Sequence, residues 1–181
     1  MTPAGKTEFV IAEPHTRRRF IREWLVTGPF DNTGSAGVQR ADVTPATLSA
    51  RSYDSAWGPA FWRRVLPQFV RIDLNAFYGR SAEAAGKPVE WLCAYAFTQV
   101  DSPSEQHAWL ELGAAQQPMQ AWLNGNALTE KPVIVTPSPQ RFPIRLHAGA
   151  NQLMVKNCKT TGDWFFTARI TDKDGHDMPG S

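Results

Sequence analysis

The sequence predicts an all-β protein, a jelly-roll β-sandwich of eight or nine antiparallel strands, and three observations support this. Short segments that alternate apolar and polar residues recur along the chain, which is the pattern of half-buried strands. The 14 prolines, 13 glycines and seven tryptophans among 181 residues favour short strands joined by turns. No segment shows the apolar period of a convincing amphipathic helix.

The clearest strand pattern lies between residues 106 and 128 and predicts a β-meander. One face of each of its two segments is apolar: Ala108, Leu110 and Leu112 in the first, and Met119, Ala121 and Leu123 in the second. Asn124-Gly125 then supplies residues that tolerate the positive φ of a tight hairpin turn.

The other strands are predicted from the same alternation, at residues 20–30, 69–74, 91–100, 141–147, 151–158 and 164–171. Segment 91–100 is expected to be central because both of its faces are mostly apolar. Segments 31–68 and 75–88 are expected to be loops. A connection as long as the first is uncommon inside a compact domain and is often a binding loop.

Length and charge bound the function. One domain is expected over residues 20–175, with a polar extension at 1–19 and a tail at 176–181. The net charge is +2, from 19 basic and 17 acidic residues, and this gives no basic face for nucleic acid. No apolar run approaches the roughly 20 residues of a membrane span. The N-terminus lacks the charged-then-apolar pattern of a secretory signal.

The two cysteines, Cys93 and Cys158, both lie inside expected strands. Free thiols that pack as small core residues are favoured over a disulfide between them. Two cysteines do not make a zinc site by themselves, and no histidine stands at ligand spacing to either.

Several segments together resemble the galactose-binding-domain-like jelly rolls, which are accessory domains of bacterial glycoside hydrolases, lyases and other exported proteins. The most recognisable are the hairpin Ala121-Trp-Leu-Asn-Gly125 and the strand Leu146-His-Ala-Gly-Ala-Asn-Gln-Leu-Met-Val-Lys156. Shorter matches are the segments 24–30, 70–74, 94–97, 102–106 and 164–170. The resemblance covers residues 24–172 and rests on turn and core positions.

The resemblance implies a non-catalytic carbohydrate-binding module, extracellular or periplasmic, within a larger glycan-active protein. Some such domains hold a structural calcium ion, and others only brace a neighbouring catalytic domain. That structural-adaptor role is the alternative function, with Trp122 as a candidate docking residue. An enzyme is not expected, because the chain has no nucleophile elbow, His-Glu-x-x-His, phosphate-binding glycine loop or Cys-x-x-Cys.

A sugar site needs an aromatic face for the pyranose ring and planar polar groups for its hydroxyls. The first candidate cluster combines Trp57, Tyr53, Asp54, Asp31 and Asn32. The alternative cluster combines Tyr78, Arg80, Asp163 and Trp164. If consecutive strands run antiparallel, the two clusters lie at opposite rims, unless the long loop folds back along the sandwich. The first rim is favoured, with Trp57 as the stacking platform.

Overall fold

The expected central strand organises the protein. The computed structural model describes residues 19–65 and 69–178. In it, β6 (Leu92–Ser102) pairs with β12 (Gly149–Lys159) along its whole length and with β1 (Trp24–Asp31) on its other edge. Its side chains alternate: Leu92, Ala94 and Ala96 enter the main core, whereas Cys93 and Tyr95 enter a second core on the opposite face. Both faces of β6 are therefore covered, as its composition predicts.

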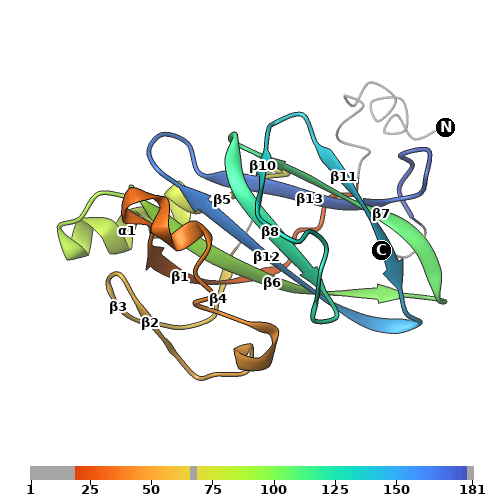
Figure 1. Cartoon of the computed structure of the whole chain (residues 1–181), viewed down its shortest axis with the longest axis horizontal. Helices are drawn as coiled ribbons and strands as arrows, with labels where there is room; N and C mark the ends of the chain where they lie inside the picture. Colours follow the sequence, from red (N-terminus) through yellow and green to blue (C-terminus); the bar gives the residue numbers. More distant parts are fainter. Residues whose placement is uncertain (1–18, 66–68, 179–181) are drawn as a thin grey trace, which may run out of the picture.

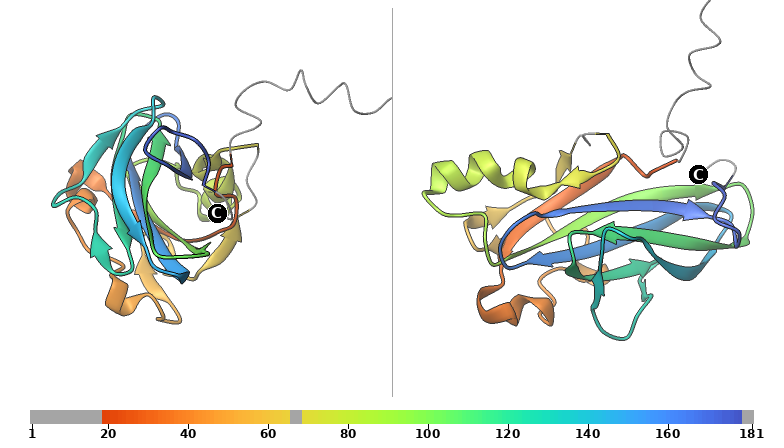
Figure 2. Two further views of the ribbon diagram at one scale, coloured as in Figure 1. Left: turned by 90° about the vertical axis from the view of Figure 1, so that its right-hand side faces the viewer. Right: turned by 90° about the horizontal axis from the view of Figure 1, so that it is seen from above.

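Two antiparallel sheets face each other and form the expected all-β sandwich (Figures 1 and 2). The seven-stranded sheet has the order β10-β8-β12-β6-β1-β4, with β9 paired to β8. Its remaining strands are β4 (Arg63–Val65), β8 (Gln117–Leu123), β9 (Asn126–Ala127) and β10 (Val133–Val135). The four-stranded sheet has the order β11-β7-β13-β5. Its strands are β5 (Ile72–Asp73), β7 (Gln106–Ala114), β11 (Gln140–Leu146) and β13 (Phe165–Thr171).

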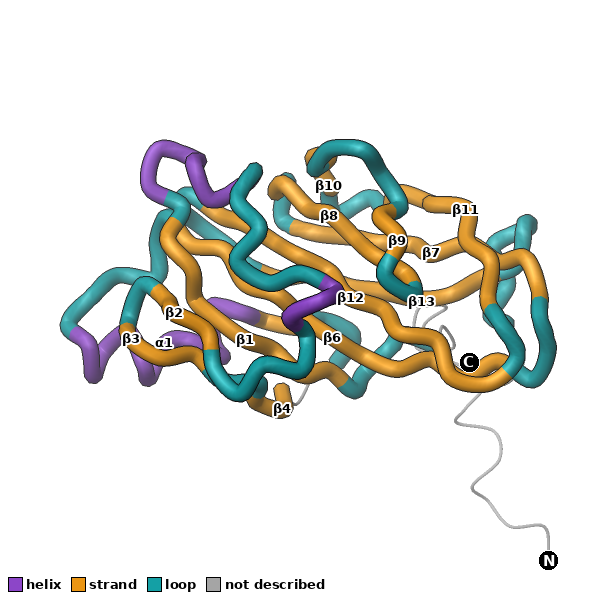
Figure 3. Tube along the Cα trace, turned by 60° about the horizontal axis from the view of Figure 1, so that its bottom comes forward, coloured by secondary structure: helices purple, strands orange, loops and turns teal. Residues whose placement is uncertain are grey.

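A long segment after β1 crosses the outer face of the seven-stranded sheet and builds the second core (Figure 3). Its elements are η3 (Thr33–Val38), η4 (Pro45–Thr47) and the hairpin of β2 (Tyr53–Ser55) with β3 (Gly58–Ala60). Thr44 caps η4 by accepting a hydrogen bond from the Thr47 N–H. This segment was expected to be a loop, and its apolar side chains, among them Val43, Tyr53 and Ala60, pack on this face of the sheet.

The second expected loop is wrong, because residues 74–85 form the helix α1 (Leu74–Ala85). Asp73 is its N-cap and accepts a hydrogen bond from the Ala76 N–H, and Gly86 ends it in the left-handed conformation. The buried residues Leu74, Tyr78 and Ala82 repeat every four positions, which is the helical period. The helix lies at the end of the sandwich where β6 begins (Figure 2). The described part of the chain contains no helix with the length and hydropathy of a membrane span.

The expectation of free cysteines is also wrong. Cys93 and Cys158 form a disulfide between β6 and β12, with Cα atoms 4.0 Å apart. The two residues stand directly opposite each other in the strand register, although 65 positions separate them in the sequence. Both are buried beneath the segment that covers this face. Their pairing follows from the register of two distant strands, which residue spacing alone does not reveal.

Candidate functional site

The two clusters predicted from the sequence lie at the same end of the sandwich, so the expected separation into two rims is wrong. The cause is β4, a three-residue strand that runs antiparallel to β1 and carries the chain back along the sheet. Asp31 at the end of β1 pairs with Leu92 at the start of β6, and Leu92 also pairs with Lys159. The connection after β1 therefore begins at the same end of the sandwich as the segment before β6 and the segment after β12. From there it folds back along the sandwich.

Four of the nine predicted site residues are buried parts of the core. Asn32, Tyr53, Tyr78 and Trp164 have exposed fractions of 1%, 8%, 0% and 1%. Asn32 donates to the Lys159 carbonyl at 3.0 Å, and the Tyr53 hydroxyl donates to the Thr47 carbonyl at 2.7 Å. Tyr78 stacks on Trp164 with ring centroids 5.4 Å apart. Burial raises the pKa of the Tyr78 hydroxyl. These side chains fill space between elements and have no free face to offer a sugar.

The other five predicted residues keep some exposed surface. Trp57 is half-buried and meets Tyr78 edge-on, with ring centroids 6.1 Å apart. The four charged residues are exposed: Asp31, Asp54, Arg80 and Asp163. Asp31 accepts a hydrogen bond from the Thr33 hydroxyl at 2.6 Å. The role of Trp57 as a stacking platform stays a prediction, with the qualification that part of its ring already packs on the helix.

A different arrangement of aromatic and polar side chains lies on the outer face of the seven-stranded sheet. Residues paired across antiparallel strands point to the same face. The register joins one such row across five strands: Arg64, Leu25, Phe97, Met154 and Trp122. We call it the apolar row, since four of its five members are apolar. Leu25 is 39% exposed, and Phe97 and Trp122 are half-buried.

A parallel row of planar polar groups borders the apolar row. Gln99 lies two residues beyond Phe97 on the same face of β6 and pairs with Gln152 of β12. Glu23 lies two residues before Leu25 and lines a hollow that Gln99 also lines. All three side chains are exposed. We call Glu23, Gln99 and Gln152 the polar row. Figure 3 shows why it is open: the segment between β1 and β2 crosses one half of this face and leaves the other half free.

Two adjoining hollows lie where the rows meet the edge of β6. The first has a volume of about 240 Å³ and is lined by Glu23, Trp24, Leu25, Arg64, Phe97, Thr98 and Gln99. The second, of about 310 Å³, continues past Gln99 to Asp101 and is walled on its other side by residues 19–23. They share Glu23, Thr98 and Gln99, and we call them together the trough. Arg64 and Glu23 form an exposed ion pair at 3.2 Å across its mouth.

The covered half of the face holds a buried lysine. The Lys156 ammonium donates to the carbonyl oxygens of Gly37, Val38 and Arg40 at 2.5, 3.1 and 2.5 Å, and its residue is 3% exposed. Burial lowers the pKa of Lys156 to about 8 and raises the pKa of the neighbouring Tyr95 to about 12. The Tyr95 hydroxyl donates to the Arg40 carbonyl at 3.2 Å. These two side chains fix the segment that crosses this face, residues 33–62, to the sheet; we call it the covering segment.

Trp122, the candidate docking residue, belongs to this arrangement. Its ring stacks on Tyr95 with centroids 6.5 Å apart, and it lines a small cavity of about 120 Å³ beside Lys156. Trp62 contributes at the other end of the covering segment, where it packs on Phe97 with centroids 6.2 Å apart. The Trp62 ring nitrogen donates to the Leu48 carbonyl at 3.1 Å. The covering segment therefore contacts the apolar row at its middle, at Phe97, whereas Trp122 at one end of the row stacks on a side chain of the same sheet.

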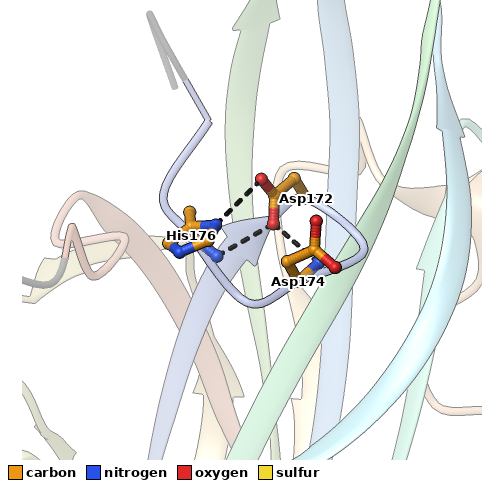
Figure 4. A group of neighbouring side chains, drawn as sticks. All are labelled: Asp172, Asp174 and His176. Carbon is orange, nitrogen blue, oxygen red and sulfur yellow. Dashed lines mark hydrogen bonds and ion pairs between the residues drawn. The ribbon is translucent and has the colours of Figure 1, made fainter.

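One group of possible metal ligands follows β13. Asp172, Asp174 and His176 bring ligand atoms within 4.8 Å of one another (Figure 4). Asp172 accepts the N–H groups of His176 and Asp174 at 2.9 and 2.8 Å, and the first of these bonds is the main cause of its lowered pKa. Arg141 donates to the Asp172 carbonyl at 2.6 Å. Closure of this turn explains the cluster, so we assign no ion to it, and the calcium allowed by the resemblance stays untested.

No family model and no curated protein matches the chain. Among solved structures, the chain is similar to a family 35 carbohydrate binding module from Clostridium thermocellum, described as its native structure. The two are 18% identical, with a TM-score of 0.30 over 42% of this chain and 69% of that chain. A likeness at this TM-score carries no argument about function, which depends on the geometry of the outer face.

Proposed function

We propose that the chain is a non-catalytic carbohydrate-binding module that binds a poly- or oligosaccharide on the open outer half of its seven-stranded sheet. The observation that carries the proposal is the adjacency of the apolar and polar rows. Phe97 and Leu25 offer a surface for the apolar face of a pyranose ring. Gln99 and Glu23, one pleat further along, offer an amide and a carboxylate to its hydroxyls.

Rigidity supports this choice of site over the end of the sandwich. The rows lie on paired strands, and β6 is held on one edge by β12 over its whole length. Side chains on such a scaffold keep their spacing before a ligand arrives, which lowers the entropy cost of binding. The disulfide between Cys93 and Cys158 joins the same two strands. It supports a location in an oxidising compartment, such as the periplasm or the cell exterior.

The experiment is a screen of the protein on a glycan array, followed by calorimetric titration of the glycans that bind. Phe97→Leu removes the aromatic ring and keeps most of the apolar volume, and Gln99→Ala removes the amide. We expect each to weaken binding about tenfold, which corresponds to about 1.4 kcal/mol. Phe69→Leu is the matched control, because Phe69 is 88% exposed and belongs to neither row.

Two results would contradict the proposal. Absence of saturable binding on the array would favour the structural-adaptor function, in which the chain only braces a neighbouring catalytic domain. Binding that survives both row variants unchanged would place the ligand elsewhere on the protein. The melting temperature of each variant is measured alongside, because Phe97 also packs on Trp62.

A further inference from the structure

The edge of β6 that faces the trough is unpaired beyond Phe97. β12 pairs with β6 as far as Ser102, but the pairing with β1 ends at Leu25 and Phe97. The chain before Trp24 turns away to the other sheet, where the Ile21 N–H donates to the Ala168 carbonyl at 2.8 Å. Within the described ranges, no β-strand covers the edge of residues 98–102.

The strand register shows which backbone groups point into the trough. Opposed residues in an antiparallel pair alternate between hydrogen-bonded pairs, with Cα atoms about 5.5 Å apart, and closer pairs without mutual hydrogen bonds. Cys93 and Cys158, at 4.0 Å, are a close pair, so the N–H and C=O of Cys93 point away from β12. The backbone N–H and C=O groups of every second residue of β6 after Cys93 therefore also point away from β12. Gln99 and Asp101 are two of these residues.

One contact within β6 agrees with this assignment. The Val100 carbonyl points toward β12, where it accepts from the Asn151 amide at 3.4 Å. Gln99 and Asp101 are both exposed and line the second hollow. No hydrogen bond to their backbone groups on this edge is found among the described residues.

We infer that the trough holds an internal stretch of an unbranched glycan chain, and that the backbone groups of Gln99 and Asp101 bind its successive sugar units. This inference rests on the proposed function. From Phe97 to Asp101 the strand advances about 13 Å, at about 3.3 Å per residue, which exceeds the length of one pyranose ring. The first unit stacks on Phe97, and the following units extend along the β6 edge.

The ends of the trough determine whether it binds the middle or the end of a glycan. Arg64 at one end has a side chain that is 64% exposed, and Asp101 and Arg19 at the other end are exposed. A site for a chain terminus needs a wall that stops the next sugar. Side chains in solvent at both ends let the glycan continue in both directions, and a branch would meet the wall formed by residues 19–23.

The first test is a length series. Linear oligosaccharides of the series that binds on the array, from the monosaccharide to the hexasaccharide, are titrated into the full chain. We expect the affinity to rise at least tenfold between the disaccharide and the tetrasaccharide. Blocking the non-reducing end of the hexasaccharide should leave its affinity unchanged. An affinity that is equal for all lengths, or that is lost on blocking the end, would overturn the inference.

The second test isolates a backbone donor. Asp101→Pro removes the N–H that points into the trough and leaves the β12 ladder intact, because proline is tolerated on an unpaired edge. Asp101→Ala is the matched control, which removes the carboxylate and keeps the N–H. We expect Asp101→Pro to weaken tetrasaccharide binding about tenfold relative to Asp101→Ala, with disaccharide binding the same in both. Equal tetrasaccharide affinities in the two variants would refute the backbone contact.

These outcomes separate the inference from the proposed function. If no glycan binds, or if Phe97→Leu and Gln99→Ala have no effect, the proposed site itself is wrong. If those variants weaken binding but the length series is flat, the site is right and only the internal-chain inference fails. Circular dichroism of Asp101→Pro verifies that the strand persists. Should that variant not fold, Gln99→Pro with Gln99→Ala as its matched control repeats the comparison at the other backbone donor.

Discussion

Removal of the disulfide should destabilise the protein strongly. The bond between Cys93 and Cys158 closes a loop with a sequence separation of 65 residues. In the chain-entropy description, a loop of this length restricts the unfolded chain by about 4 kcal/mol at room temperature. This is a large share of the roughly 5–15 kcal/mol that stabilises an ordinary domain. The double variant Cys93→Ala/Cys158→Ala should therefore lose a large part of its free energy of unfolding.

Alanine is the suitable replacement because both residues are buried and serine would leave two hydroxyls without partners. The assay is equilibrium unfolding in urea for the wild type, the reduced and alkylated wild type, and the double variant. The last two should both unfold well below the urea concentration of the oxidised wild type, with the alkylated protein the less stable because alkylation adds bulk and polar atoms at two buried positions. Thiol titration of the unfolded, unreduced wild type should detect no free thiol.

Two results would refute this reasoning. Free thiols in the wild type would show that the cysteines are unpaired. The Cα separation of 4.0 Å between Cys93 and Cys158 would then need another explanation. A double variant as stable as the oxidised wild type would show that the crosslink restricts the unfolded chain far less than its loop length indicates. A changed m-value would indicate that the surface exposed on unfolding has changed between the variants.

Three further predictions concern the helix, Trp57 and alkaline pH. Asp73→Ala removes the N-cap of α1 and should cost about 1 kcal/mol, measured by urea unfolding, whereas Asp174→Ala on an exposed turn serves as comparison. Trp57→Ala should lower the melting temperature through its lost contact with Tyr78 and leave glycan affinity unchanged; lost affinity at an unchanged melting temperature would restore Trp57 as the platform. The free energy of unfolding should rise with pH from about 8, because Lys156 loses its proton in the folded state first. Above pH 10 it should fall, because buried Tyr95 keeps its proton until about pH 12 while the unfolded chain ionises. Lys156→Met should reduce the rise, to which Lys159 also contributes because burial lowers its pKa, and Tyr95→Phe should reduce the fall.

The strands of the core could be predicted because their alternation is a local property. The faces of β6 follow directly from its sequence, with Leu92, Ala94 and Ala96 inward and Cys93 and Tyr95 outward. The helix α1 also left a local signal, in the N-cap Asp73 and the four-residue repeat of its buried side chains. That signal was missed because the repeat is short and, apart from Phe77, the intervening residues are small or polar.

Topology was harder to predict than strand positions, and one short strand shows why. β4 contains three residues, too few for an alternation to stand out. Its presence nevertheless reverses the direction of the chain between β1 and β5. A count of strands that omits β4 therefore assigns each later loop to the wrong end of the sandwich. This is why the two predicted clusters meet instead of lying apart.

The proposed site on the outer face was hard to predict for the same reason, because it depends on how distant strands pair. Arg64, Leu25, Phe97, Met154 and Trp122 come from five strands, and only the pairing register places them in one row. Each of these residues alone is typical of a strand. Which part of the row is open depends in turn on where Lys156 and Trp62 fasten the covering segment. A segment fastened further along the sheet would cover Gln99 and Gln152, and the polar row would become buried amides that need partners. The position of the proposed site is therefore set by how far the covering segment extends along the sheet. Residues 33–62 form the boundary of the site, although the proposal assigns them no contact with the glycan.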